Sequence, residues 1–174
     1  MKKFIISIDA GTTSNRAILF DLKGKPIFSS QKEFTQYFPK SGWVEHNPEE
    51  IWKTTLKTLK DVIAKAKKLN GNILTIGITN QRETTVLWDK KTGKPVYNAI
   101  VWQDRRQEDF CKKLRKQNKD TMIFNKTGLL IDSYFSGTKI KWILDNVPKA
   151  RQLMNKKQLL FGTIDSFLIW RLTK

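Results

Sequence analysis

Short apolar runs alternate with polar turns in the first part of the chain, which is the pattern of consecutive strands. Apolar residues dominate 5–8 and 17–20, and the polar residues gather in the turn between these two runs. A second turn at 21–26 leads into a third run at 27–34. We therefore expect three antiparallel strands joined by tight turns.

A helical pattern follows these strands. Asn47 provides an N-cap, Pro48 suits the first helical position, and Glu50 is placed to close a capping box. An apolar stripe then recurs at helical spacing and predicts a helix with a core-facing side that ends at Asn70-Gly71. Its members are Ile51, Trp52, Leu56, Leu59, Ile63 and Ala66.

The nearly continuous apolar run at 73–78 predicts a central strand buried on both faces. Further along, the pattern predicts a hairpin, two helices, a short strand and a last helix that begins after Thr163. The expected ranges are 84–89 and 95–102 for the hairpin, about 103–118 and 136–147 for the helices, 158–161 for the strand and 164–172 for the last helix. Strands mixed with helices define an α/β class.

The composition is that of a globular protein with an unusual charge. The net charge is +17, from 33 basic and 16 acidic residues. Such an excess raises the expectation of a polyanion partner. However, lysine pairs such as Lys67-Lys68 and Lys112-Lys113 are dispersed along the chain, whereas a surface that reads a duplex favours clustered arginine. We expect no specific nucleic-acid partner.

The lack of long apolar segments and the low cysteine content bear on where the protein is located. No apolar run approaches the length of a membrane span, and the chain enters its first strand too early for a signal peptide. The single cysteine, Cys111, cannot form an internal disulfide, and we expect it to be a small packed side chain. These features favour the cytoplasm and no membrane partner.

The turn between the first two strands concentrates the candidate chemistry. A glycine there allows the backbone to approach a ligand closely, three hydroxyl residues offer donors to phosphate oxygens, and a carboxylate suits magnesium. The alternative is an ordinary hairpin with a polar turn. The polar groups are Asp9, Thr12, Thr13, Ser14 and Arg16, with the glycine at Gly11.

This hairpin, followed by a third strand, a helix and a buried strand, resembles the ribonuclease H-like (actin-like ATPase) fold. Hsp70-type chaperones also carry the Asp-x-Gly-Thr-Thr turn, so the turn does not separate kinase from chaperone. Further segments resemble the glycerol kinases of the FGGY family of carbohydrate kinases. They are Gly42-Trp43-Val44-Glu45-His46 and the stretches at 77–85, 98–106, 126–142 and 160–165.

The resemblance implies roles for individual residues. It implies ATP phosphates as ligands of Thr12, Thr13, Ser14 and Arg16, and Mg²⁺ near Asp9. It also implies a glycerol site. The residues that would bind the glycerol hydroxyls are Arg82, Glu83 and Tyr134, and Trp102 would lie against the carbon backbone.

The chemistry of the last four residues agrees with a small triol. Arg82 brings donors and Glu83 brings acceptors, just beyond the C-terminal end of an expected strand. A surface ion pair is the alternative for these two residues, and core packing is the alternative for Tyr134 and Trp102. His46 reads as a loop residue without a partner that would make it a base.

Taken together, we expect residues 1–174 to be an incomplete N-terminal FGGY kinase domain that is inactive alone. The resemblance implies that the general base, an aspartate, and much of the nucleotide site lie beyond residue 174; it is also compatible with a homo-oligomer. Two residues depart from the usual pattern, Ala10 and Asn15. The alternatives are another FGGY sugar kinase, a non-catalytic remnant and an Hsp70- or actin-like ATPase. A ribonuclease H-like nuclease would need several convergent carboxylates.

Overall fold

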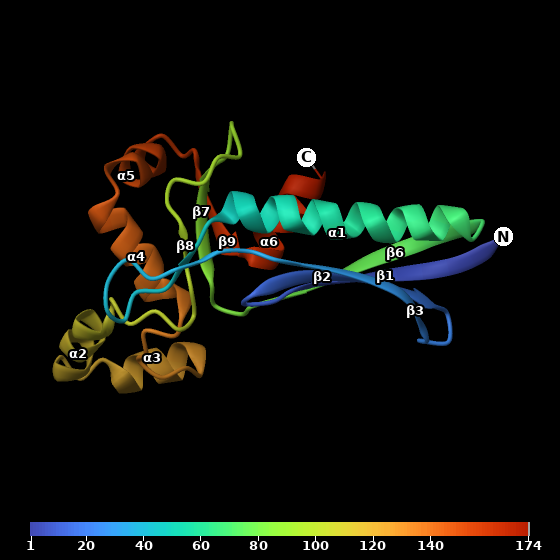
Figure 1. The fold of residues 1–174 in the computed structure, drawn as a ribbon. Coiled ribbons are helices and arrows are strands. Elements are labelled where there is room, and N and C mark those ends of the chain that lie inside the picture. The colour runs from blue at the N-terminus through green and yellow to red at the C-terminus, as the bar shows by residue number, and fades with distance from the viewer. Residues whose placement is uncertain (174) are drawn as a thin grey trace. The chain divides into compact units, whose positions relative to one another are not determined.

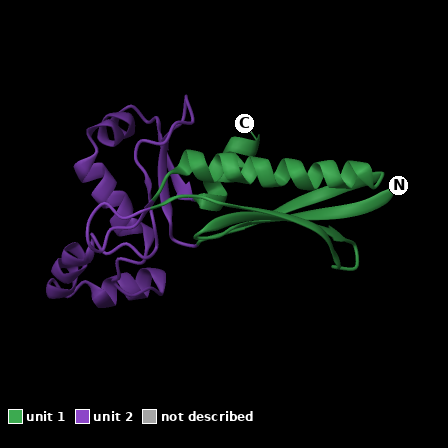
Figure 2. Ribbon diagram, viewed as in Figure 1, with its two compact units in different colours: residues 1–36, 46–81, 164–174 green, residues 37–45, 82–163 purple. Residues whose placement is uncertain are grey.

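The computed structural model describes residues 1–173, and the chain divides into two compact units (Figure 2). Unit 1 contains residues 1–36, 46–81 and 164–174, and unit 2 contains residues 37–45 and 82–163. That the two units together form one family domain stays a prediction. No helix within residues 1–173 is both long enough and apolar enough to cross a membrane.

Unit 1 is built on a four-stranded sheet in the order β3-β2-β1-β6. The first three strands form the antiparallel meander that the sequence predicts, and β6 pairs with β1 in parallel. The bounds are Lys2–Ala10 for β1, Ser14–Asp21 for β2, Pro26–Glu33 for β3 and Gly71–Asn80 for β6.

Helix α1, Pro48–Lys68, lies along this sheet (Figure 1). Asn47 is its N-cap, as predicted, and its side chain accepts a hydrogen bond from the Glu49 N–H at 2.9 Å. The apolar stripe of the helix packs against β1 and β2, although Trp52 is only partly buried. The core consists of Phe4, Ile6, Ile8, Ala17, Leu19, Leu59, Val62 and Ala66.

The expectation that 73–78 is a central strand buried on both faces is wrong for this chain. Strand β6 lies at one edge of the four-stranded sheet, and Leu74 and Ile76 are 50% and 40% exposed. A continuous apolar run shows that both faces of a strand are apolar. It does not show that other segments within residues 1–173 pack against both of those faces.

Unit 2 holds most of a second sheet, in the order β4-β5-β8-β7-β9, with β7 antiparallel to both neighbours. The strands β4 and β5 lie at the boundaries between the units. The bounds are Gln36–Tyr37 for β4, Glu45–His46 for β5, Thr85–Asp89 for β7, Ala99–Ile100 for β8 and Leu159–Thr163 for β9.

Four helices belong to unit 2, and one more, α6 at Ile164–Thr173, returns to unit 1. The core of unit 2 consists of Leu87, Ile100, Ile143 and Ala150. The four helices are α2 at Glu108–Lys116, α3 at Asp120–Thr127, α4 at Ser136–Asn146 and α5 at Pro148–Asn155.

Several expectations for unit 2 need correction. The expected helix at 103–118 begins only at Glu108, and the expected strand at 95–102 is reduced to Ala99–Ile100. Helices α3 and α5 were not predicted. Helix α4 ends before Pro148 as expected, but the same proline begins α5 at once, because its fixed φ suits a first helical position.

Candidate functional site

The phosphate turn, which we define as residues 11–14, closes on itself between β1 and β2. The Gly11 N–H donates to the Ser14 carbonyl at 3.0 Å. A Cβ at Gly11 would lie 3.2 Å from that same oxygen, closer than most Cβ contacts. A side chain is therefore disfavoured at Gly11 because the turn is tight.

The carbonyl groups of the phosphate turn are tied to other parts of unit 1. The Gln81 side-chain amide donates to the Gly11 carbonyl at 3.1 Å, and the Gln36 amide donates to the Thr12 carbonyl at 3.0 Å. The Phe34 N–H donates to the Thr13 carbonyl at 3.3 Å. A trans peptide carries its C=O and N–H on opposite sides. The Thr12 and Thr13 N–H groups therefore face away from the two glutamines.

The structure brings the five predicted phosphate and metal residues close together. Asp9 and Arg16 are paired in register across β1 and β2, so their side chains lie on the same face, and both residues are exposed. Arg16 Nε donates to the side-chain oxygen of Gln31 at 3.0 Å. The amide nitrogen of Gln31 donates to Ser14 Oγ at 2.8 Å. Thr13 is exposed at the turn. The face combines hydroxyl groups, one guanidinium and one carboxylate.

This face fits a magnesium ion only in company with a phosphate. Residues 1–173 contain no group of three or more His, Cys, Asp or Glu side chains that could hold a metal ion. Magnesium commonly keeps several waters and is held by one or two carboxylates together with substrate phosphates. The single exposed carboxylate of Asp9 meets that requirement, whereas an all-protein cage is not available.

In unit 2, Glu83 is held in an unusual conformation. Its φ is +65°, in the left-handed region that non-glycine residues seldom adopt. Its Oε2 accepts hydrogen bonds from the N–H and the hydroxyl of Ser136, both at 2.8 Å, at the N-terminus of α4. A carboxylate is stabilised there by the helix dipole. Such strain is concentrated at functional sites in many proteins.

The alternative of a surface ion pair between Arg82 and Glu83 does not hold for this structure. Within residues 1–173 no ion pair joins the two side chains, and Glu83 is engaged with Ser136 instead. Arg82 is exposed and precedes Glu83 directly. The two residues are thus adjacent in the chain, and Ser136 fixes the Glu83 carboxylate.

Trp102 and Tyr134 lie beside Glu83. Their rings are 6.0 Å apart between centroids, at an interplanar angle of 67°. The Trp102 N–H donates to the hydroxyl of Thr84 at 3.3 Å, and the Tyr134 N–H donates to Asp132 at 2.7 Å. Both aromatic residues are only partly buried, so neither is purely a core residue. We call Arg82, Glu83, Trp102 and Tyr134 the polyol cluster.

Sequence reasoning missed Lys139, which supports this cluster. The residue is fully buried, and its ammonium donates to the Ser133 carbonyl at 2.9 Å and to the Tyr134 carbonyl. Burial lowers the pKa of Lys139 to about 8. One signal was available in the sequence. Lys139 lies four residues before the buried Ile143, on the inward face of α4.

A second support fixes the segment that carries Trp102. The Arg106 guanidinium is wholly buried, 3.7 Å from the ring centre of Trp43 and 4.6 Å from that of Trp142. It forms ion pairs with Glu45 and Asp104, each at 2.8 Å. Burial by itself raises the pKa of Glu45, but hydrogen bonds from Tyr97, Asn98 and Arg106 outweigh it and lower that pKa.

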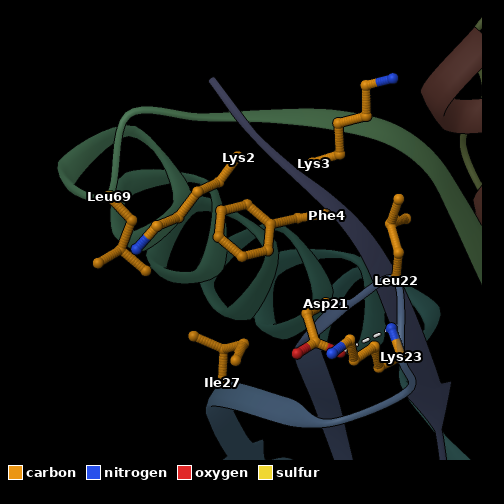
Figure 3. Close-up of a pocket in the computed structure, with 8 residues that line it drawn as sticks. All are labelled: Lys2, Lys3, Phe4, Asp21, Leu22, Lys23, Ile27 and Leu69. Atoms are coloured by element: carbon orange, nitrogen blue, oxygen red, sulfur yellow. Dashed lines mark hydrogen bonds between the residues drawn. The ribbon is translucent and has the colours of Figure 1, made fainter.

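A cavity of about 540 Å³ lies in unit 1 (Figure 3). It is next to the beginning of β1, whereas the phosphate turn follows the end of β1. It is mainly apolar with a charged margin, and we assign no ligand to it. The lining residues are Lys2, Lys3, Phe4, Asp21, Leu22, Lys23, Ile27 and Leu69.

Comparison with known proteins identifies the family. Residues 4–174 match the FGGY family of carbohydrate kinases, N-terminal domain, and the chain belongs to that family. The glycerol kinase of Malacoplasma penetrans is 60% identical over 172 residues, which are 99% of this chain and 34% of that protein. The glycerol kinase of Alkaliphilus metalliredigens is 58% identical over 174 residues, all of this chain and 35% of that protein.

Solved structures agree with the family. Plasmodium falciparum glycerol kinase with ADP superposes with a TM-score of 0.93 at 36% identity, over 99% of this chain and 34% of that one. Gluconate kinase from Lactobacillus acidophilus gives 0.84 at 23% identity, over 98% of this chain and 33% of that one, and so shows the fold alone. The ribonuclease H-like α/β fold is confirmed. The chain spans about a third of the length of the relatives that it matches.

Proposed function

We propose that this chain takes part in phosphorylation of glycerol by ATP, which yields ADP and sn-glycerol 3-phosphate. The observation that carries the proposal is the polyol cluster, in a chain 60% identical to a glycerol kinase. Glycerol offers only hydroxyl groups along a short carbon chain. Its recognition therefore needs paired donors and acceptors beside an apolar wall.

The polyol cluster supplies each of these parts. Glu83 accepts hydrogen bonds from glycerol hydroxyls with a carboxylate that Ser136 holds in place, and the adjacent Arg82 donates hydrogen bonds. Tyr134 adds a phenolic hydroxyl, and Trp102 lies against the carbon backbone. A site without these groups would leave glycerol hydroxyls unpaired. Unpaired polar groups in a confined site are costly, so such a site would bind glycerol less tightly.

The phosphate turn supplies the nucleotide contacts. Thr12, Thr13 and Ser14 present N–H and hydroxyl donors to the phosphates of ATP, and Arg16 adds a guanidinium. Asp9 would hold Mg²⁺, directly or through water, and the ion would supply neutralisation of the phosphate charge. Because ATP is the phosphoryl donor, we place the protein in the cytoplasm.

Phosphoryl transfer also needs a group outside the residues described here. The terminal hydroxyl oxygen of glycerol forms a bond to the γ-phosphorus while the bond from that phosphorus to the ADP oxygen breaks. The hydroxyl proton passes to a general base, which the FGGY resemblance assigns to an aspartate beyond residue 174. We therefore expect no turnover from the 174-residue chain by itself.

The test is a hybrid kinase in which this chain replaces the matching third of the Malacoplasma penetrans relative. ADP release that depends on glycerol is expected from the hybrid. Arg82→Ala and Glu83→Ala should each lower kcat/KM for glycerol by roughly 2–4 kcal/mol, with little change in KM for ATP. Thr13→Ala should raise KM for ATP and leave KM for glycerol nearly unchanged.

Controls separate the substrate from the fold. Arg151→Ala removes an exposed guanidinium of α5 and should change neither KM. Xylulose and gluconate are offered in place of glycerol, and a preference for either would favour another FGGY sugar kinase. Unchanged glycerol kinetics in both Arg82→Ala and Glu83→Ala would remove the polyol assignment.

A further inference from the structure

His46 is the single histidine of the chain and is fully buried in unit 1. The sequence predicted a loop residue with no partner that would make it a base, and the loop assignment is wrong. The residue belongs to β5, and its ring meets that of Phe34 edge-on with 5.1 Å between centroids. A polar ring in such a place must be paired or it destabilises the fold.

The imidazole is paired with Gln36. His46 Nε2 lies 2.6 Å from Gln36 Oε1, and the amide nitrogen of the same Gln36 side chain donates to the Thr12 carbonyl. Because the amide nitrogen is committed to a carbonyl, Oε1 must accept, so His46 Nε2 carries the proton. Turning the Gln36 amide over would place two oxygens 3.0 Å apart at Thr12. The Thr12 carbonyl and the His46 Nε2–H thus both favour this one orientation of the amide.

Burial lowers the pKa of His46 to about 4, against a smaller opposing effect of the Gln81 side chain. The ring is thus neutral near pH 7. The side-chain amide of Gln81 donates to the Gly11 carbonyl. Its backbone N–H donates to the Ala10 carbonyl of β1 at 2.8 Å.

We propose that His46 is a positioning residue for nucleotide binding, which acts through Gln36 on the phosphate turn. The two glutamines hold the Gly11 and Thr12 carbonyls on one side of the turn. The N–H groups of Thr12 and Thr13 then face the other side, where the proposed function places the phosphates of ATP. This inference rests on that proposed function, and His46 itself touches no ligand.

The arrangement has an electrostatic reason. Without the glutamines, carbonyl oxygens of a flexible turn could rotate toward the phosphates and repel them. A turn whose peptide planes are fixed beforehand avoids reorganisation when the ligand binds. A neutral histidine serves here because it donates one proton to an amide oxygen without adding a buried charge.

The test measures two ligands on the isotope-labelled 174-residue chain by NMR. Magnesium tripolyphosphate is followed at the amides of residues 11–14, and glycerol is followed at the amide of Tyr134. His46→Phe keeps an aromatic ring but loses the donor, and Gln36→Leu breaks the same connection at a partly exposed residue. Each should weaken tripolyphosphate binding by about five- to tenfold and leave glycerol binding unchanged.

Coupling and controls distinguish positioning from general damage. The double variant should bind tripolyphosphate no more weakly than the weaker single variant, because both changes break one connection. Thr58→Val is the control, since this buried hydroxyl bonds only within α1, to Thr55 at 3.0 Å, and its loss should leave both affinities unchanged.

Each contrary result has its own meaning. Tripolyphosphate binding that His46→Phe and Gln36→Leu leave intact would overturn the positioning role while the proposed function stands. Equal weakening of both ligands would show a structural role only, which also overturns it. If tripolyphosphate leaves residues 11–14 of the unsubstituted chain unshifted, the nucleotide assignment fails, and the role of His46 fails with it.

Discussion

The ammonium group of Lys139 is buried, and no carboxylate within residues 1–173 is in direct contact with it. Its partners are the Ser133 and Tyr134 carbonyls, so the positive charge is compensated mainly by dipoles. Burial lowers its pKa from 10.5 to about 8, against the attraction of Glu83, Asp104 and Asp132. The folded state therefore binds this proton less tightly than the unfolded state does.

The free energy of unfolding should therefore depend on pH. Below pH 8 Lys139 is charged in both states, and its burial opposes folding. As the pH rises from 8 to 10.5, the folded state loses the proton first, and the cost disappears. Relative to Lys139→Met, the free energy of unfolding of the original chain should rise by roughly 3 kcal/mol across this window. Urea titrations at each pH measure it, and parallel curves for the two proteins would contradict the prediction.

Neighbouring arginines allow a matched comparison. Arg106 is wholly buried against two indole rings, whereas the Arg105 side chain is 56% exposed and pairs with Asp132. Lysine cannot reproduce the planar, forked contacts of Arg106. Arg106→Lys should lower the free energy of unfolding by about 2–4 kcal/mol, and Arg105→Lys by less than about 1 kcal/mol. Equal losses in urea unfolding would refute the assigned role of the buried guanidinium.

At the residue scale, the sequence singled out the residues of the proposed ligand sites but not the residues packed behind them. Thr13 and Glu83 stand in short motifs whose chemistry is readable from residue type. Lys139 and His46 are not readable in this way. A lysine in a helix is usually solvated, and a lone histidine beside a helix cap suggests no partner. Gln36, which contacts His46, lies ten residues earlier, and nothing in the sequence links the two.

At the scale of the elements, periodicity predicted the strands and helices that local contacts determine. The meander and α1 are confirmed because tight turns and a 3.6-residue stripe are local signals. Strand β6 was predicted correctly as a strand, but its burial was not, since cover depends on residues far along a chain. Helix α3 lacks any buried residue and so shows no stripe that periodicity could detect.

The start of β6 carries a glycine that packing requires. A Cβ at Gly71 would lie 2.1 Å from Cε2 of the buried Phe4 ring, whereas a Cβ at Gly77 in the same strand would meet nothing within 4 Å. Gly71→Ala should therefore displace Phe4 and lower the free energy of unfolding by about 1–3 kcal/mol. Gly77→Ala should leave it unchanged or slightly raised. Thermal and urea unfolding of both variants decide between packing and the general effect of glycine in a strand.

For the whole molecule, charge is the property that the fold explains least. The net charge of +17 is spread over both units, and several lysines are committed to local partners. Lys57 pairs with Asp61 at 2.7 Å on α1, and Lys141 pairs with Asp145 at 2.6 Å on α4. Two arginines, Arg106 and Arg16, likewise have side-chain partners, Asp104 and Gln31. A positive charge of this kind attracts polyanions without reading them.

Binding of duplex DNA should accordingly be weak and independent of sequence. Contacts between dispersed lysines and phosphates release counterions, so the affinity should fall steeply as salt increases. Fluorescence anisotropy with two duplexes of equal length and different sequence, titrated at low and at physiological salt, measures both properties. Similar affinities at low salt and loss of binding at physiological salt are expected. A sequence preference that survives physiological salt would require a base-reading surface, and the dispersed charge would then need a functional explanation of its own.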